Sequence, residues 1–225
     1  MLLLFSATGL YAVNAQHLKV LKQGREAWNL FRDQNPMEQP DLTKANLSHF
    51  SLKGYNLKFA NLSYAKLVGT NLMGADLSFA QLERVDARKA NFAGAKLNMA
   101  NLRRANFQAA QFLEADLSKT NFASGKNVPA KLTEEKFLTK TIFLQANFYK
   151  ANLAGLDLKE TLLKNASFKE AILENANLAG HDLTTNVLDN AKLFKANLSG
   201  ATIKSKYRMY IQEQEVYNFK NIKWK

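Results

Sequence analysis

Three histidines are the residues of this chain best suited to metal binding or acid–base chemistry, but their spacing supports neither. His17, His49 and His181 lie far apart, there is no cysteine, and no paired carboxylates accompany them at metal-ligand spacing. The sequence also lacks a G-x-S-x-G elbow, a glycine-rich phosphate loop and an H-E-x-x-H helix. We therefore predict no catalytic residue, no metal site and no cofactor, and we expect the protein to work through its surface.

A five-residue repeat positions that surface. Leu or Phe occupies 28 of 30 centres spaced five residues apart, from Leu42 to Phe122 and from Phe143 to Ile203, and the exceptions are Ala87 and Ile203. Two residues before each centre the chain mostly holds Ala, and one residue before it mostly holds Asn or Asp, as in Ala60-Asn61-Leu62. With a period of five, the centres would not stay on one face of a helix, nor on one face of a straight strand. The chain therefore has to bend once per unit, which produces a coil.

Each position of the unit has a physical role. Leu or Phe fills the interior, Ala fits a tighter inward position, and Asn or Asp bonds to nearby backbone groups at a turn. The A-N/D-L-x-x unit resembles the pentapeptide repeat family. The resemblance implies an all-β solenoid, a right-handed quadrilateral β-helix with four pentapeptides per coil. It implies much less about function, because a solenoid core does not determine what its surface binds.

Both ends of such a solenoid require caps, since they would expose apolar side chains and unpaired edges. Residues 16–36 predict an N-terminal capping α-helix, because Leu18, Leu21, Trp28 and Phe31 recur near helical spacing. Trp28 and its neighbours could instead form a ligand site, but packing is the favoured interpretation. Residues 206–225 lack the repeat and are rich in aromatic side chains. They predict a C-terminal cap or, alternatively, a homodimer contact.

An irregular insertion at residues 125–140 separates repeat block 1 (40–124) from repeat block 2 (141–205). Phe122 and Phe143 are 21 residues apart, one more than a coil of 20. Either a bulged coil or a loop with a helical turn fits this spacing. Three apolar residues are expected to point outward just after it: Ile142, Leu144 and Leu162. We interpret the insertion as a lid that covers them with Leu132, Phe137 and Leu138, and a functional loop is the alternative.

Residues 1–15 predict a signal peptide. Leu2 to Val13 is apolar and uncharged, and Val13-Asn14-Ala15 offers residues that a signal peptidase accepts. The missing basic n-region favours the alternative, a cytoplasmic protein. The apolar run is too short to span a bilayer, so we expect no transmembrane segment in the mature chain. The prediction is a periplasmic or secreted protein whose mature chain begins at Gln16.

Stacking at a period of 20 arranges outward residues in ladders. One ladder is basic and aromatic, with Arg103 beside it: Lys44, Tyr64, Arg84 and Arg104. A neighbouring ladder is apolar: Phe59, Phe79 and Met99. A solvated basic face needs no partner, but three stacked exposed apolar residues are unusual. We predict that the two ladders form an interaction surface, unless the C-terminal tail covers the apolar one.

Two function classes remain. The first is a non-catalytic scaffold, exported, that binds a partner protein or an acidic cell-envelope component. The second is an intracellular nucleic-acid or topoisomerase binding protein, because some pentapeptide repeat proteins mimic DNA and bind DNA gyrase. A duplex mimic needs an anionic surface. This chain carries 31 basic and 19 acidic side chains, for a net charge of +12, which disfavours mimicry. Direct contact between DNA and the basic ladder remains electrostatically favourable.

Overall fold

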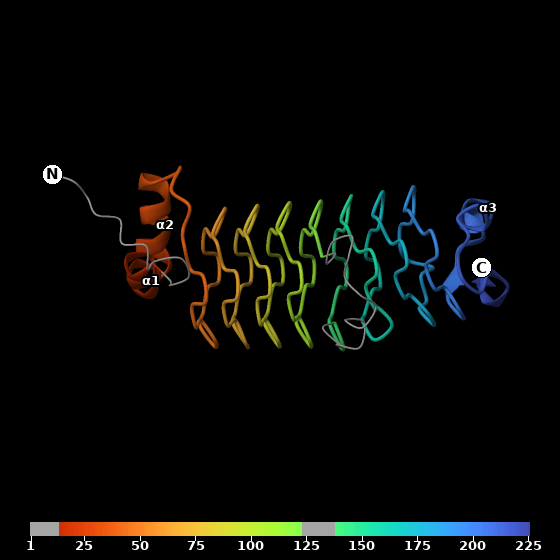
Figure 1. Cartoon of the computed structure of the whole chain (residues 1–225), viewed down its shortest axis with the longest axis horizontal. Helices are drawn as coiled ribbons and strands as arrows, with labels where there is room; N and C mark the ends of the chain where they lie inside the picture. Colours follow the sequence, from red (N-terminus) through yellow and green to blue (C-terminus); the bar gives the residue numbers. More distant parts are fainter. Residues whose placement is uncertain (1–13, 123–137) are drawn as a thin grey trace, which may run out of the picture.

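The computed structural model describes residues 14–122 and 138–225 and shows an elongated coil with helices at both ends (Figure 1). The helices are α1 (Ala15–Lys22), α2 (Arg25–Gln34) and α3 (Arg208–Gln212), with short 3₁₀ helices η2 (Ser205–Tyr207) and η3 (Phe219–Asn221). The strands are β1 (Thr202–Ile203) and β2 (Lys223–Trp224). No helix in the described parts of the chain is long and apolar enough to cross a membrane.

Successive coils pair in parallel at the expected spacing of 20 residues, as Asp41 does with Asn61 and Asn61 with Gln81. The expectation of an all-β solenoid is met only in part. Apart from β1 and β2, the described coils are joined by single-residue bridges and not by longer strands. The reason is the length of the unit, because three extended residues are followed at once by a two-residue turn.

Each coil has four faces, which we number by their buried inward residues. Face 1 contains Leu42, Leu62, Leu82, Leu102, Phe122, Leu153, Leu173 and Leu193. Face 2 contains Leu47, Leu67, Ala87, Phe107, Leu138, Leu158, Leu178 and Leu198. Face 3 contains Leu52, Leu72, Phe92, Phe112, Phe143, Leu163, Leu183 and Ile203. Face 4 contains Leu57, Leu77, Leu97, Leu117, Phe148, Phe168 and Leu188.

The backbone hydrogen bonds explain why Asn or Asp precedes the centre. In the unit around Leu62, the N–H groups of Asn61, Leu62, Tyr64 and Ala65 all donate to backbone carbonyls. The remaining N–H, that of Ser63, donates to Asn61 Oδ1 at 3.1 Å. The same side-chain bond recurs along the rod from Asp41 to Asn197. The Asn or Asp side chain thus satisfies the one amide that the coil leaves unpaired.

The structure gives the register across the insertion, which the spacing had left open. Phe143 does not stack on Phe122 but on Phe112, with ring centroids 5.1 Å apart. Leu138 is buried and takes the face 2 position above Phe107, so the repeat resumes at Leu138 and not at residue 141. Phe122 on face 1 and Leu138 on face 2 take consecutive inward positions of the coil, but they are 16 residues apart where a unit needs five.

The predicted lid therefore changes. Leu138 belongs to the core and cannot cover an outward patch, because its side chain fills the interior of the coil. Leu132 and Phe137 lie outside the described residues. Ile142, Leu144 and Leu162 do lie on the outer side of face 3, where Leu162 is exposed and the other two are half-buried.

Two helices stand where one was expected over residues 16–36. Gly24 separates them, and its φ of 113° lies outside the helical range, so the chain turns between α1 and α2. Leu21 and Trp28 are buried against the first coil. Residues 1–13, which hold most of the predicted signal peptide, lie outside the described residues.

The C-terminal residues occupy the place of a further coil. Tyr207 Oη accepts the N–H of Leu188 at 3.1 Å, and Tyr210 Oη donates to the carbonyl of Ala191 at 2.6 Å. β2 pairs in parallel with β1, as a next coil would. Ile211 is completely buried. These contacts favour the capping interpretation of residues 206–225 over a tail that is free to form a dimer.

Candidate interaction surface

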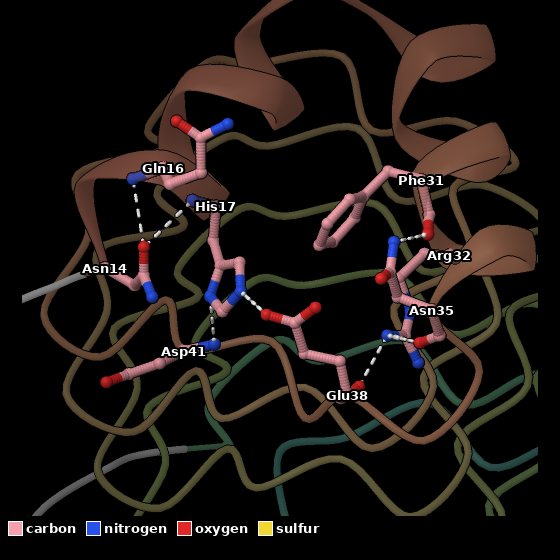
Figure 2. A network of polar contacts seen from close by, with 8 residues as sticks. All are labelled: Asn14, Gln16, His17, Phe31, Arg32, Asn35, Glu38 and Asp41. Atoms are coloured by element: carbon pink, nitrogen blue, oxygen red, sulfur yellow. Dashed lines mark hydrogen bonds and ion pairs between the residues drawn. The ribbon is translucent and has the colours of Figure 1, made fainter.

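His17 joins the N-terminal helices to the first coil. Its buried ring lies between two partners: Nε2 is 2.6 Å from Glu38 Oε1, and Nδ1 accepts the N–H of Asp41 at 2.9 Å (Figure 2). Because Nδ1 accepts an amide hydrogen, the ring proton of neutral His17 lies on Nε2 and faces Glu38. Asn14 begins α1 by accepting the N–H groups of Gln16 and His17. The histidine therefore has a structural role in this contact.

Trp28 and Asn29 also serve the cap and do not line a ligand site. Trp28 is fully buried, and its Nε1 donates to the carbonyl of Asn56 at 2.7 Å. Asn29 Oδ1 accepts the N–H of the same Asn56 at 2.8 Å. Arg32 donates to the carbonyls of Glu38 and Lys58, and burial lowers the pKa of its guanidinium although Glu38 opposes this. The helix thus provides the partners that a preceding coil would supply.

His181 occupies an inward position that usually holds Ala. Its Nε2 lies 2.7 Å from the carbonyl oxygen of Leu158 in the preceding coil. Thr70 also replaces Ala, and its hydroxyl donates to the carbonyl of Leu47 at 2.8 Å. At both positions the polar side chain forms a hydrogen bond between adjacent coils. Within residues 14–122 and 138–225, no three His, Cys, Asp or Glu side chains converge to hold a metal ion.

The predicted surface residues occupy strained corners of the coil. The second residue after most centres has a left-handed φ, including 62° at Phe59, 62° at Phe79 and 60° at Met99. This conformation costs a residue with a side chain about 1 kcal/mol, whereas glycine adopts it freely. The chain does use glycine at another corner, where Gly54, Gly74 and Gly94 recur every 20 residues. The fold therefore gives no reason for large apolar side chains at these positions.

The structure brings the apolar ladder together at the corner between faces 4 and 1. The rings of Phe59 and Phe79 stack with centroids 4.9 Å apart and planes inclined by 28°. Met99 takes the same corner of the next coil, and its side chain is 47% exposed. Lys58 Nζ lies 5.4 Å and 5.9 Å from the two ring centroids, a cation–π arrangement.

The basic ladder lies at the next corner, between faces 1 and 2. Backbone bonds align Lys44, Tyr64, Arg84 and Arg104 in successive coils. The guanidinium of Arg84 lies 5.6 Å from the centroid of the Tyr64 ring. Arg103 precedes Arg104 at the same corner, so the predicted basic residues gather as expected. The two ladders border face 1, and we call this area of the first coils the face 1 surface.

Sequence reasoning missed the middle of the face 1 surface and the cation beside its rings. Asn61, Gln81 and Asn101 form the row between the two ladders, and Asn101 Nδ2 donates to Gln81 Oε1 at 3.0 Å. Gln81 departs from the Asn or Asp of the repeat, which is the signal that could have revealed this row. Lys58 could have been found because it precedes Phe59 at the same corner.

The C-terminal tail does not cover the apolar ladder. Its side chains bond to Leu188, Ala191 and Leu193 in the last described coil. α3 lies at the end of the rod opposite to α1 and α2, which pack on the first coil (Figure 1). The rival explanation, in which the tail buries Phe59, Phe79 and Met99, is therefore wrong for this structure.

The pentapeptide repeats family matches the chain in eight copies, over residues 41–78, 52–86, 88–122, 137–165 and 161–200. The comparison with curated proteins gave no match. A trypsin-treated variant of QnrB1, a plasmid-mediated fluoroquinolone resistance protein, superposes with a TM-score of 0.57 at 13% identity. That alignment covers 82% of this chain and 88% of the other, and it shows a shared fold alone.

A second solved structure is alr5209, a pentapeptide repeat protein from Nostoc PCC 7120. It is 33% identical over 54% of this chain and 93% of its own, with a TM-score of 0.40. The repeat matches cover more than half of the chain and coincide with the units that form the coils. The chain belongs to the pentapeptide repeat family.

Proposed function

We propose that this protein is a non-catalytic scaffold that binds an acidic partner protein on its face 1 surface. The observation that carries the proposal is the apolar ladder of Phe59, Phe79 and Met99. These side chains are large, stacked and partly exposed, although their backbone conformation favours glycine. Stacked exposed hydrophobic residues are uncommon on a protein surface without a partner.

The ladder supplies enough apolar area to anchor a partner. Burying a side chain of this size contributes about 1.5 to 3 kcal/mol, and three of them contribute up to about 9 kcal/mol before the costs of association. Part of this burial free energy is already gained in the free protein, because Phe59 and Phe79 cover one another. The remaining apolar area still exceeds that of singly scattered surface residues.

The charges support an acidic partner. Lys58 lies over the aromatic rings, and Arg84 and Arg104 border the same face. With a net charge of +12, the whole chain attracts anionic partners over long distances, and this mainly accelerates association. An acidic cell-envelope component is the second ligand class that this arrangement accommodates.

The alternative is an intracellular protein that binds nucleic acid or a topoisomerase. It is suggested by family members that mimic DNA, and QnrB1 is itself described as a fluoroquinolone resistance protein. A mimic of the duplex presents negative charge, whereas this chain has an excess of positive charge. Direct binding of DNA to Arg84 and Arg104 is the form of the alternative that the charges allow.

We also propose export to the periplasm or the exterior, on the basis of the apolar segment from Leu2 to Val13. Cleavage after Ala15 would remove Asn14, which caps the first turn of α1. Cell fractionation combined with mass spectrometry of the N-terminus tests this proposal. Export predicts a chain that begins at Gln16 outside the cytoplasm, whereas cytoplasmic protein with an intact Met1 would overturn it.

The binding proposal is tested with the combined variant Phe59→Ser, Phe79→Ser and Met99→Ser. We expect it to keep the folding stability of the native chain and to lose acidic proteins that the native chain captures from a lysate of the source cells. The matched control is Phe194→Ser with Met209→Ser, which removes exposed apolar residues near the other end of the rod, away from the first coils. Unchanged capture by the first variant, or capture of nucleic acid in place of acidic protein, would overturn the proposal.

A further inference from the structure

A second apolar surface lies on face 3, opposite the face 1 surface. It consists of Leu113, Ile142, Leu144 and Leu162, which we call the aliphatic patch. Leu162 is 54% exposed and Leu113 is 41% exposed. Ile142 pairs with Leu162 in adjacent coils, and the N–H of Glu114 donates to the carbonyl of Leu144. The four side chains therefore form one patch across three coils.

The fold does not require this patch. Ile142 and Leu162 stand just before their centres, where Asn or Asp normally accepts the N–H two residues further on, as Asn147 does for Tyr149. An aliphatic side chain makes no such bond, so each position forgoes a hydrogen bond worth about 1 kcal/mol. Ile172 and Val187 also replace the usual Asn or Asp, but each lies on another face without a second aliphatic residue in the same row of the adjacent coil. Within residues 14–122 and 138–225, face 3 alone stacks two of them.

The local charges indicate what covers the patch. With a net charge of +12, two copies of this chain repel one another except where their contacting charges balance. Glu114 lies in the first row of the patch, Lys164 lies in the third, and the central row of Ile142 and Leu144 carries no charge. Glu114 and Lys164 are therefore opposite in charge, and each lies one coil away from the central row.

We propose that the aliphatic patch is the contact between two antiparallel copies of this chain. A two-fold axis along the central row places Glu114 of each copy beside Lys164 of the other, and the pair occurs twice. The apolar residues of the central row then meet their own counterparts. A contact across three coils is smaller than the roughly 1,200 Å² of most specific interfaces, so we expect a weak dimer with a micromolar dissociation constant.

Sedimentation velocity over a range of concentrations tests the proposal without reference to the face 1 surface. We expect the native chain to dimerise and Leu162→Glu to weaken the dimer by about tenfold or more, because it buries an unpaired charge. Val187→Glu is the matched control, since it adds the same charge to an exposed apolar position on face 4. We expect it to leave the dimer unchanged.

A charge exchange tests the register of the dimer. Glu114→Lys should weaken association, and Glu114→Lys combined with Lys164→Glu should restore it, because the paired charges are then only reversed. This arm also remains informative if Leu162→Glu fails to fold. A native chain that stays monomeric at about 200 µM, where a micromolar dimer would be populated, would overturn the proposal. Failure of the double charge exchange to restore association would also overturn it. The same holds if Met209→Glu in the C-terminal cap dissociates the dimer and Leu162→Glu does not.

Discussion

The Nδ1 atom of His17 accepts the backbone N–H of Asp41 at 2.9 Å. In the following coil, the equivalent N–H of Asn61 donates to the carbonyl of Pro40 at 2.8 Å. A side chain of α1 thus gives Asp41 the acceptor that a preceding coil gives Asn61. Because buried amides without a partner are costly, this contact helps to determine where the solenoid begins.

Replacing the imidazole tests this role. His17→Phe keeps an aromatic ring but removes the acceptor, so the N–H of Asp41 loses its partner. We expect the free energy of unfolding to fall by about 1 to 3 kcal/mol in a urea melt. His49→Phe is the control, because His49 is exposed at a corner of the coil. Equal stability of the two variants would show that the histidine contact does not stabilise the cap.

The Asn or Asp before each centre is predicted to stabilise the coil through one bond. Asn91 Oδ1 accepts the N–H of Ala93 at 2.9 Å. Asn91→Ala should therefore lower the free energy of unfolding by about 0.5 to 1.5 kcal/mol. Lys96→Ala, at the same place in the next unit, removes no such bond and should be nearly silent. Equal losses in a denaturant melt would contradict this account of the repeat.

Inward and outward positions should respond very differently to charge. Leu62 is fully buried, whereas the neighbouring Ser63 lies at a turn. We expect Leu62→Asp to cost more than about 4 kcal/mol and to unfold adjacent coils, because it buries an unpaired carboxylate. Ser63→Asp should change stability by less than about 0.5 kcal/mol. Similar circular dichroism melting curves for the two variants would refute the assignment.

The sequence was sufficient to predict the coil and both ladders of the face 1 surface, because Leu62 and its counterparts repeat strictly. It did not predict how the repeat resumes at Leu138. The spacing between Phe122 and Phe143 is nearly a whole coil, so it left a bulged coil and a loop as alternatives and did not reveal that Phe143 stacks on Phe112. Nor could it show that His17 and Asn29 bond to the first coil, because those contacts join residues that are distant in sequence.

The pair formed by Asp86 and Arg88 predicts a dependence on pH. Arg88 donates to both carboxylate oxygens at 2.8 Å, and this hydrogen bonding holds the pKa of Asp86 below its usual value of 3.8. Because the pKa of Asp86 is lower in the folded state, the pair stabilises the protein above about pH 3.8. This stabilisation is lost as the pH falls through the pKa that Asp86 has in the folded state.

We therefore expect Arg88→Ala to lower stability only slightly at neutral pH, since the pair is exposed to solvent. The difference from the native chain should be smaller at acidic pH than at neutral pH, because protonation of Asp86 removes its charge from the pair. Urea melts at the two pH values measure it, with Lys89→Ala as the control. A difference that persists at acidic pH would have another cause.

The most direct test of the face 1 surface is site-specific photocrosslinking in the source cells, with a benzophenone amino acid placed at Phe79. Asn190 is the matched control position, because it occupies the same left-handed corner near the other end of the rod. We predict a discrete crosslinked product with an acidic protein from position 79 and none of that product from position 190. The account would be contradicted if the two positions gave the same products, or if position 79 gave none.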